Sequence, residues 1–275
     1  MLKSGVPFII FAIKIPSTMP ANNQPSLFRR PAIFAPFPGL AAAESTRHGG
    51  VSPPPYASLN LGFHTDDRPE NVLENRRRFL AALGISPDNL ATSHQVHGNK
   101  VLIARQPGHY EGYDALISDQ KGIFVAIGTA DCAPILVYDP AREAVAAIHA
   151  GWRGTAQQVA KGALLAMQQE FGTRPEDCHA YIGACIDQDN YEVDGNVARH
   201  FSAVNKREDT ARGKWFVSLK GENKAQLLDM GVPEEQIEVS PYSTWAHNED
   251  YFSHRRENGT TGRMLAAIGL VPRSS

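Results

Sequence analysis

Apolar and polar positions along the chain give their clearest helical pattern after Asp66-Asp67. Pro69 suits the first turn of a helix, and Gly84 is suited to end it. Between these two residues, the apolar side chains fall on one helix face: Val72, Phe79, Leu80 and Leu83. The pattern therefore predicts a helix from about residue 69 to residue 83.

Arg76 falls inside the apolar stripe of this helix. A buried guanidinium needs a carboxylate partner or an anionic ligand, because an unpaired charge in apolar surroundings is costly. Both interpretations stay open from the sequence: an ion pair with a core carboxylate, or a binding role.

Short apolar, β-branched runs separated by turn residues follow, and each predicts a strand. They lie at residues 101–104, 114–118, 122–128, 133–139, 144–150, 181–186 and 237–240. Helical patterns occur from Ala156 to Phe171, near 195–203 and near 222–230. Because the strands cluster and do not alternate strictly with helices, we predict an α+β fold: mixed β-sheets packed together and flanked by helices.

The chain reads as one domain with two short appendages. We expect residues 1–30, which contain several prolines and no periodic face, to form a poorly ordered extension. Their apolar run mimics a signal peptide, but Lys14 interrupts it and no small-x-small cleavage site follows closely; a true start at Met19 or later is an alternative. Residues 31–271 contain no linker or repeat and form the expected catalytic domain, and residues 272–275 resemble a protease-cleavage tag.

Composition narrows the function classes. Of 275 residues, 42% are apolar and 20% are charged, as in ordinary globular proteins, and the formal net charge is −2. No basic stripe stands out, which argues against nucleic acid or an anionic membrane as partner. Three cysteines are an odd number in a chain too large to need disulfides, so we expect free thiols and a cytoplasmic location.

Three segments place metal-binding or charged side chains at strand ends: residues 93–98, 129–132 and 149–155. Cys132 and His149 flank a hairpin made from the runs 133–139 and 144–150, which would bring them together. Two histidines and one thiolate leave the fourth position of a tetrahedral zinc ion open, as in catalytic sites. Spacing alone does not decide whether His94 or His97 supplies the second imidazole.

Residues 151–155 also carry a candidate anion site. A strand that ends in glycine and leads into a helix leaves backbone N–H groups free, and Arg153 adds a full charge. An ordinary capped helix start is the alternative. Near the C-terminus, Arg255, Arg256 and Arg263 lie within nine residues after an aromatic pair, so we expect at least one of them to point into a pocket.

These motifs occur in the order found in a known family. The matching segments are residues 45–52, 58–62, 74–76, 95–98, 129–132, 149–154, 252–256 and 261–263. From residue 44 to about 270 the chain therefore resembles the YfiH-type laccase-domain family, once called multicopper polyphenol oxidoreductases and now regarded as purine nucleoside phosphorylases. The resemblance implies a single α+β domain and a zinc ion bound by His97, Cys132 and His149, which leaves His94 out.

The resemblance further implies a cytoplasmic enzyme that cleaves adenosine, inosine, guanosine or methylthioadenosine with phosphate and also deaminates adenosine. We expect Asp131, Cys132, His149 and Arg153 to be catalytic. Four side chains are expected to bind phosphate, ribose or its hydroxyls: Arg47, Asn60, Arg76 and Arg255. The expected partners are small molecules alone, and the expected assembly is a monomer or a small homo-oligomer.

Three other functions remain as alternatives. A copper-dependent polyphenol oxidase would bind copper through the same residues, but the ten histidines contain none of the H-x-H pairs of three-copper clusters. In a cysteine hydrolase, for example one that edits peptidoglycan precursors, His149 would activate Cys132, and bound metal would block that thiolate. A zinc-stabilised binding protein would have no open coordination position.

Overall fold

Two six-stranded β-sheets packed on each other form the centre of the molecule, of which this computed structural model describes residues 26–272. The first sheet has the strand order β1 (Phe28–Arg29), β2 (Leu40–Ser45), β15 (Met264–Leu270), β7 (Phe124–Thr129), β3 (Leu90–His94), β5 (Gly108–Glu111). The second has the order β14 (Ile237–Val239), β10 (His179–Ile182), β8 (Ala133–Asp139), β9 (Ala144–Ala150), β6 (Ala115–Ser118), β4 (Val101–Ile103).

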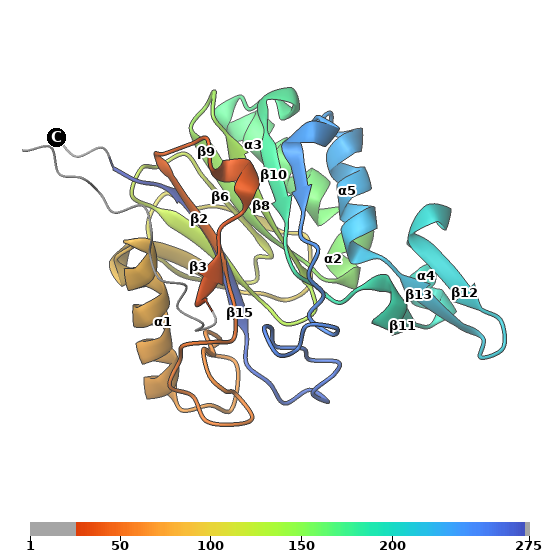
Figure 1. Ribbon diagram of the computed structural model, residues 1–275. Helices are drawn as coiled ribbons and strands as arrows, with labels where there is room; N and C mark the ends of the chain where they lie inside the picture. The colour runs from red at the N-terminus through yellow and green to blue at the C-terminus, as the bar shows by residue number, and fades with distance from the viewer. Residues whose placement is uncertain (1–25, 273–275) are drawn as a thin grey trace, which may run out of the picture.

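Helices cover the outer faces of both sheets (Figure 1). Those in the described residues are α1 (Pro69–Leu83), α2 (Trp152–Ala156), α3 (Val159–Phe171), α4 (Gly195–Ala198) and α5 (Leu219–Asp229). A three-stranded sheet projects to one side of the assembly and has the order β11 (Glu192–Val193), β13 (Lys214–Val217), β12 (Lys206–Asp209). The prediction of a single α+β domain with packed, helix-flanked sheets is confirmed.

Strand periodicity explains the layering. In β8, Ile135 and Val137 face the core beneath α3 and α5, whereas Leu136 and Tyr138 face the first sheet. Since successive side chains of a strand point to opposite faces, a continuous apolar run is what a strand buried on both faces requires. All seven residues of β8 and all seven of β9 are buried accordingly.

Several predicted elements match the structure closely. Strands β8 and β9 have the predicted bounds and form the predicted antiparallel hairpin. Helix α1 begins at Pro69 and ends before Gly84, which has a φ of 74°. The pattern missed β2 and β15, which pair with each other in the first sheet.

The helix predicted from Ala156 to Phe171 is two helices. The chain breaks between α2 and α3 at Gln158, whose φ is 58°. In an unbroken helix the carbonyl of Thr155 would accept a hydrogen bond from the N–H of Val159. Here that carbonyl accepts hydrogen bonds from the N–H of Gln158 (3.0 Å) and from Gln226 Nε2 on α5 (2.8 Å). A local turn, held also by a contact from α5, therefore closes α2.

The N-terminal boundary also differs from the prediction. Phe28 and Arg29 form β1, and the Arg29 guanidinium donates to Asp250 Oδ2 (2.9 Å) and to the Tyr251 hydroxyl (2.9 Å). The folded domain therefore includes residues 26–30, which were predicted to belong to the extension. Residues 1–25 and 273–275, with the predictions made for them, lie outside the described residues. None of the helices in residues 26–272 is long and apolar enough to span a bilayer.

Glu44 on β2 is a buried carboxyl group in the core, and its protonation makes the stability of the fold depend on pH. Its buried carboxyl accepts hydrogen bonds from the Tyr181 hydroxyl (2.7 Å) and the Ala184 N–H (2.8 Å). Burial raises the pKa of Glu44 from 4.5 to about 7, although both hydrogen bonds oppose that change. Because the folded state binds this proton more tightly than the unfolded state does, the stability it contributes is lost as pH rises from about 4.5 through 7.

We expect Glu44→Gln, which stays neutral, to gain stability relative to the wild type between pH 5 and pH 8. The gain should be on the order of 3 kcal/mol, since each pKa unit corresponds to about 1.4 kcal/mol. Melting temperatures at four pH values measure it, with Glu170→Gln on α3 as the solvent-accessible control. A stability difference that does not change with pH would contradict the assignment.

Candidate metal centre and active-site pocket

The β8–β9 hairpin brings two of the candidate metal ligands together. In its register Ala133 pairs with Ala150 and Pro134 with His149, so Cys132, just before β8, lies opposite Gly151. A Cβ atom on Gly151 would lie 2.9 Å from Cys132 Sγ and 3.1 Å from His97 Cδ2. Glycine is therefore the residue that this close approach requires.

The third candidate ligand, His97, lies in the loop between β3 and β4 and has a φ of 59°. One donor atom each from His97, Cys132 and His149 lies within 4.8 Å of the others. His149 is buried and His97 is exposed, so a bound ion would face the interior on one side and a pocket on the other. Two imidazoles and one thiolate fit zinc or copper chemically.

His94 is not part of this group. Its Nδ1 lies 3.0 Å from Glu111 Oε2, and its ring stacks on the ring of His64 with centroids 4.3 Å apart. The structure therefore brings together the three residues that the family resemblance implies, and it leaves His94 outside this group.

Asp114 joins the two sides of the metal centre. This residue precedes β6 and is fully buried. Its Oδ1 lies 2.8 Å from Nδ1 of His149 and accepts a hydrogen bond from the N–H of His97 (2.9 Å). Its Oδ2 accepts from the N–H groups of Val96 (3.2 Å) and Gly98 (2.7 Å). One carboxylate thus orients one imidazole and holds the loop that carries the other.

Charges within this group stabilise the thiolate. Burial tends to raise the pKa of Cys132, but His149 and His97 outweigh it, and the pKa is lowered. Burial likewise tends to lower the pKa of His149, but Cys132 and Asp114 raise it. Thiolate is the form of cysteine that binds a metal ion or acts as a nucleophile.

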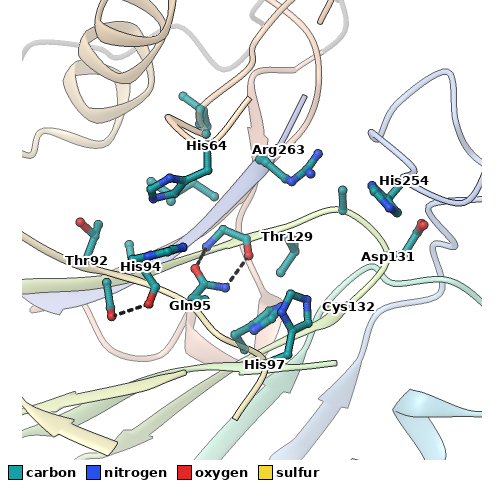
Figure 2. A pocket seen from close by; sticks show the side chains of 18 of the residues that line it. His64, Thr92, His94, Gln95, His97, Thr129, Asp131, Cys132, His254 and Arg263 are labelled. Carbon is teal, nitrogen blue, oxygen red and sulfur yellow. Dashed lines mark hydrogen bonds between the residues drawn. The ribbon is translucent and has the colours of Figure 1, made fainter. Parts of the chain in front are cut away.

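The metal centre opens into a cavity of about 410 Å³ (Figure 2). This volume lies in the range of small-molecule sites. Gln95, which lines the cavity, is bound to β7. Its side-chain amide donates a hydrogen bond to the Gly128 carbonyl and accepts one from the Gly128 N–H, both at 2.8 Å. Four arginines from distant parts of the chain line the cavity: Arg76, Arg153, Arg255 and Arg263.

Asp131 lines the cavity beside Cys132 and has a φ of 85°. Its carboxylate accepts hydrogen bonds from the hydroxyls of Thr244 (2.6 Å) and Ser253 (2.7 Å) and from the backbone N–H of Arg255 (2.6 Å). A carboxylate with three short donors is well suited to holding a loop. Here it holds the segment that presents His254 and Arg255 to the cavity.

The predicted anion site at 151–155 has a different form from the one expected. Helix α2 has only five residues and no side-chain cap at Gly151. Arg153 itself is exposed, lines the cavity and lies over the ring of Trp152 at 4.7 Å. The arginine side chain, and not the short helix, is therefore the feature of this segment that suits an anion.

Two expected substrate residues lie outside the cavity. The Arg47 guanidinium donates to the carbonyls of Ala57 (2.9 Å) and Asn248 (2.8 Å) and pairs with Glu257 (3.1 Å). The Asn60 side chain is fully buried, donates to Thr65 and Asp67, and accepts from the N–H groups of Gly62 and Arg263. The polar groups of both side chains are hydrogen-bonded to neighbouring loops, so neither side chain is in a position to contact a ligand in the cavity.

Sequence reasoning missed Asp114, although a carboxylate directly before a buried apolar strand was visible at 114–118. It also missed His64 and His109, which line the cavity near His94. No local pattern marks these two residues, since the fold alone brings their loops and strands together.

Comparison with known proteins agrees with this geometry. The family described as "Multi-copper polyphenol oxidoreductase laccase" matches residues 41–271. The chain belongs to this family. It is 42% identical over 245 residues to a Deinococcus radiodurans protein named purine nucleoside phosphorylase, covering 88% of this chain and 94% of that protein. It is 40% identical over 238 residues to purine nucleoside phosphorylase YfiH of Escherichia coli, covering 85% and 95%.

A solved structure shows the same fold. The crystal structure of YlmD from Geobacillus stearothermophilus has a TM-score of 0.84 to this chain at 35% identity, and the match covers 90% of this chain and all of that one. The α+β architecture is therefore the one this family adopts.

We expect Cys132→Ala and His97→Ala to reduce bound metal from about one equivalent per chain to near zero, because each removes one of three protein ligands. His94→Ala should retain the full equivalent. Elemental analysis of the purified variants measures this. Loss of metal from His94→Ala, with retention in His97→Ala, would show that the ligand assignment is wrong.

We expect Asp114→Asn to weaken metal binding by about 10- to 100-fold, the usual effect of removing a carboxylate that orients a ligating histidine. The asparagine side chain would also place its NH₂ group against backbone N–H groups that now donate to a carboxylate oxygen of Asp114, so those hydrogen bonds would be lost. Competition with a metal chelator measures the affinity. Asp139→Asn, another buried aspartate at the far end of the β8–β9 hairpin, is the matched control and should bind metal like the wild type.

Proposed function

We propose that the protein is a zinc-dependent purine nucleoside phosphorylase. It would convert adenosine, inosine, guanosine or methylthioadenosine, with phosphate, into the free base and the ribose 1-phosphate. One observation carries the proposal: the His97–Cys132–His149 group opens into the cavity that Arg153, Arg255 and Arg263 line. The relatives named purine nucleoside phosphorylase support the substrate class.

The arginines near the metal centre suit phosphate. Arg153 has no ion-pair partner within residues 26–272, and Arg255 uses one nitrogen on the Glu192 carbonyl (2.9 Å). Arg263 donates to the carbonyls of Thr261 and Gly262, both at 2.9 Å, and otherwise faces the cavity. Cations without carboxylate partners at one end of a cavity are suited to an oxyanion. Asp131 would act there as a positioning residue for Arg255.

Phosphorolysis requires an anion held against the anomeric carbon of the ribose. A phosphate oxygen forms a bond to C1′ while the C1′–N9 bond breaks, and the purine leaves with the electron pair and then takes up a proton. The arginines would orient the phosphate and balance its charge, which contributes to the rate through positioning and electrostatic stabilisation.

His97, Cys132 and His149 would hold the zinc ion. Bound zinc would supply Lewis-acid chemistry, including the activation of water that adenosine deamination requires. Within residues 26–272 the three cysteines are free, in agreement with a proposed cytoplasmic location.

A cysteine hydrolase is the second candidate, and a specific arrangement favours it. The Asp114 carboxylate orients His149, whose other ring nitrogen faces Cys132, so the three form the sequence carboxylate–imidazole–thiol. Nucleophilic cysteine enzymes use the same order of groups. The third ligand, His97, distinguishes the two cases, since a metal ion bound by all three residues would occupy the thiolate.

A copper oxidase receives less support. Among the described residues, only His97, Cys132 and His149 form a group of three or more metal-capable side chains close enough to hold an ion. Multicopper oxidation of phenols requires several copper ions near each other, whereas this group provides for one.

We expect purine release from inosine to depend on phosphate and to yield ribose 1-phosphate. Arg153→Ala should raise the KM for phosphate about tenfold, the effect of losing one charged hydrogen bond, and change the KM for inosine by less than about twofold. Steady-state kinetics over both substrates measures this, with the exposed Arg105→Ala as control. Free ribose formed at an unchanged rate without phosphate would identify a hydrolase instead.

A further inference from the structure

The two ends of the active-site cavity differ in chemistry. The end beside the metal centre carries Asp131, Arg153, His254 and Arg255, and Arg263 lies between the two ends with its side chain against Gly62. The other end, here called the imidazole end, is lined by Leu61, Phe63, His64, Arg76, His94 and His109. Figure 2 shows His64 and His94 on one side of the cavity, with His254 and Asp131 on the opposite side. An elongated ligand would therefore meet three histidines and Arg76 at one end, and Arg153 and Arg255 with Trp152 and Tyr191 at the other.

His64 and His94 form a stacked pair of rings within the imidazole end. Their rings are 4.3 Å apart with planes tilted by 28°, and the His109 ring lies 6.1 Å from that of His64. Burial, with the nearby His94 and His109, lowers the pKa of His64, which favours a neutral ring. Flat aromatic side chains are surfaces on which nucleic-acid bases stack.

Arg76 lines the imidazole end of the cavity. Its Nε donates to the Leu61 carbonyl (2.8 Å), and its guanidinium lies over the ring of Phe63 at 4.3 Å. The carboxylate partner that the sequence left open is absent: within residues 26–272 no acidic group pairs with Arg76. Its two terminal nitrogens make no hydrogen bond to any described residue, and burial lowers its pKa to about 10.

A half-buried guanidinium that lines a cavity and has unused N–H groups can donate to an acceptor on a ligand. Arginine pairs well with N7 and O6 on one edge of guanine, and hypoxanthine carries the same two acceptors. Adenine keeps N7. The apolar neighbours of Arg76, among them Leu61 and Phe63, suit a base better than a hydrated dianion, for which Arg153, Arg255 and Arg263 are available.

We propose that the imidazole end binds the purine base, which stacks on the free face of the His64–His94 ring pair while Arg76 donates hydrogen bonds to N7 and, where present, O6. This rests on the proposed nucleoside function. The ribose then lies toward the metal centre, with C1′ facing the phosphate held by Arg153, Arg255 and Arg263. As the C1′–N9 bond breaks, its electron pair passes to the purine, and the Arg76 cation stabilises that negative charge until the base takes up a proton.

Binding of inosine and 7-deazainosine tests the contact to N7 directly. The second compound has a carbon in place of N7 and so lacks that acceptor. Calorimetric titration of the metal-loaded enzyme without phosphate should show inosine binding about tenfold tighter than 7-deazainosine, the effect of one good arginine–base contact. In Arg76→Met the two should bind within about twofold of each other. Arg77→Met, on the exposed face of the same helix, is the control and should keep the wild-type ratio.

His94→Ala provides a second variant, because the half-exposed His94 side chain can be removed with little risk to folding. It should weaken inosine and 7-deazainosine binding by a similar factor of about tenfold, as loss of a stacking surface does, and leave the KM for phosphate unchanged. This readout stays available if Arg76→Met does not fold.

The outcomes separate this proposal from the proposed function. An inosine to 7-deazainosine ratio that Arg76→Met leaves unchanged overturns the proposal, and so does a rise in the KM for phosphate in place of weaker nucleoside binding. Neither result affects phosphorolysis itself. Conversely, if nucleosides bind with the expected ratios but phosphate brings no turnover, the base site stands and the phosphorylase function fails.

Discussion

The carboxylate of Asp114 is the contact on which the geometry of the metal centre depends. It is completely buried, yet four hydrogen bonds to one imidazole and three backbone N–H groups satisfy it. Burial tends to raise its pKa, but these donors outweigh burial and hold the pKa below the usual value. A buried charge of this kind is tolerated only with its full set of partners, so the loop carrying His97 and the ring of His149 are held in one arrangement.

How far the sequence predicts this arrangement depends on how local each contact is. Cys132 and His149 could be paired from the sequence because a short hairpin of two continuous apolar runs connects them. Spacing could not distinguish His97 from His94, because His97 lies in an irregular loop and has a φ of 59°. A hydrogen bond from its N–H to Asp114, which is distant in sequence, holds that loop. Strands β2 and β15 escaped the pattern for a simpler reason: their alanine-rich sequences have little β-propensity and are strands through their pairing.

The expected substrate residues show the same limit. Arg47, Asn60 and Arg76 all lie in segments that match the family, and residue type gives no reason to separate them. In the structure Arg47 and Asn60 have their hydrogen-bonding groups taken up by loop backbones, whereas Arg76 uses only one of its nitrogens. A polar residue in a family motif is available to a ligand only if its side chain has hydrogen-bonding groups left unused. Only the fold shows which residues meet this condition.

Two of the five non-glycine residues with a positive φ in the described part of the chain, His97 and Asp131, line the cavity. Both residues adopt the left-handed conformation that is unfavourable for residues with a Cβ atom; His97 is a candidate metal ligand, and Asp131 directly precedes another, Cys132. Carboxylate hydrogen bonds hold both residues in this conformation. Asp114 accepts from the N–H of His97. The Asp131 carboxylate itself accepts from Thr244, Ser253 and the N–H of Arg255. Because one network holds the loop of His97 and the other holds the segment of Arg255, the candidate metal ligands and a cavity cation are preorganised, which is the property electrostatic catalysis requires.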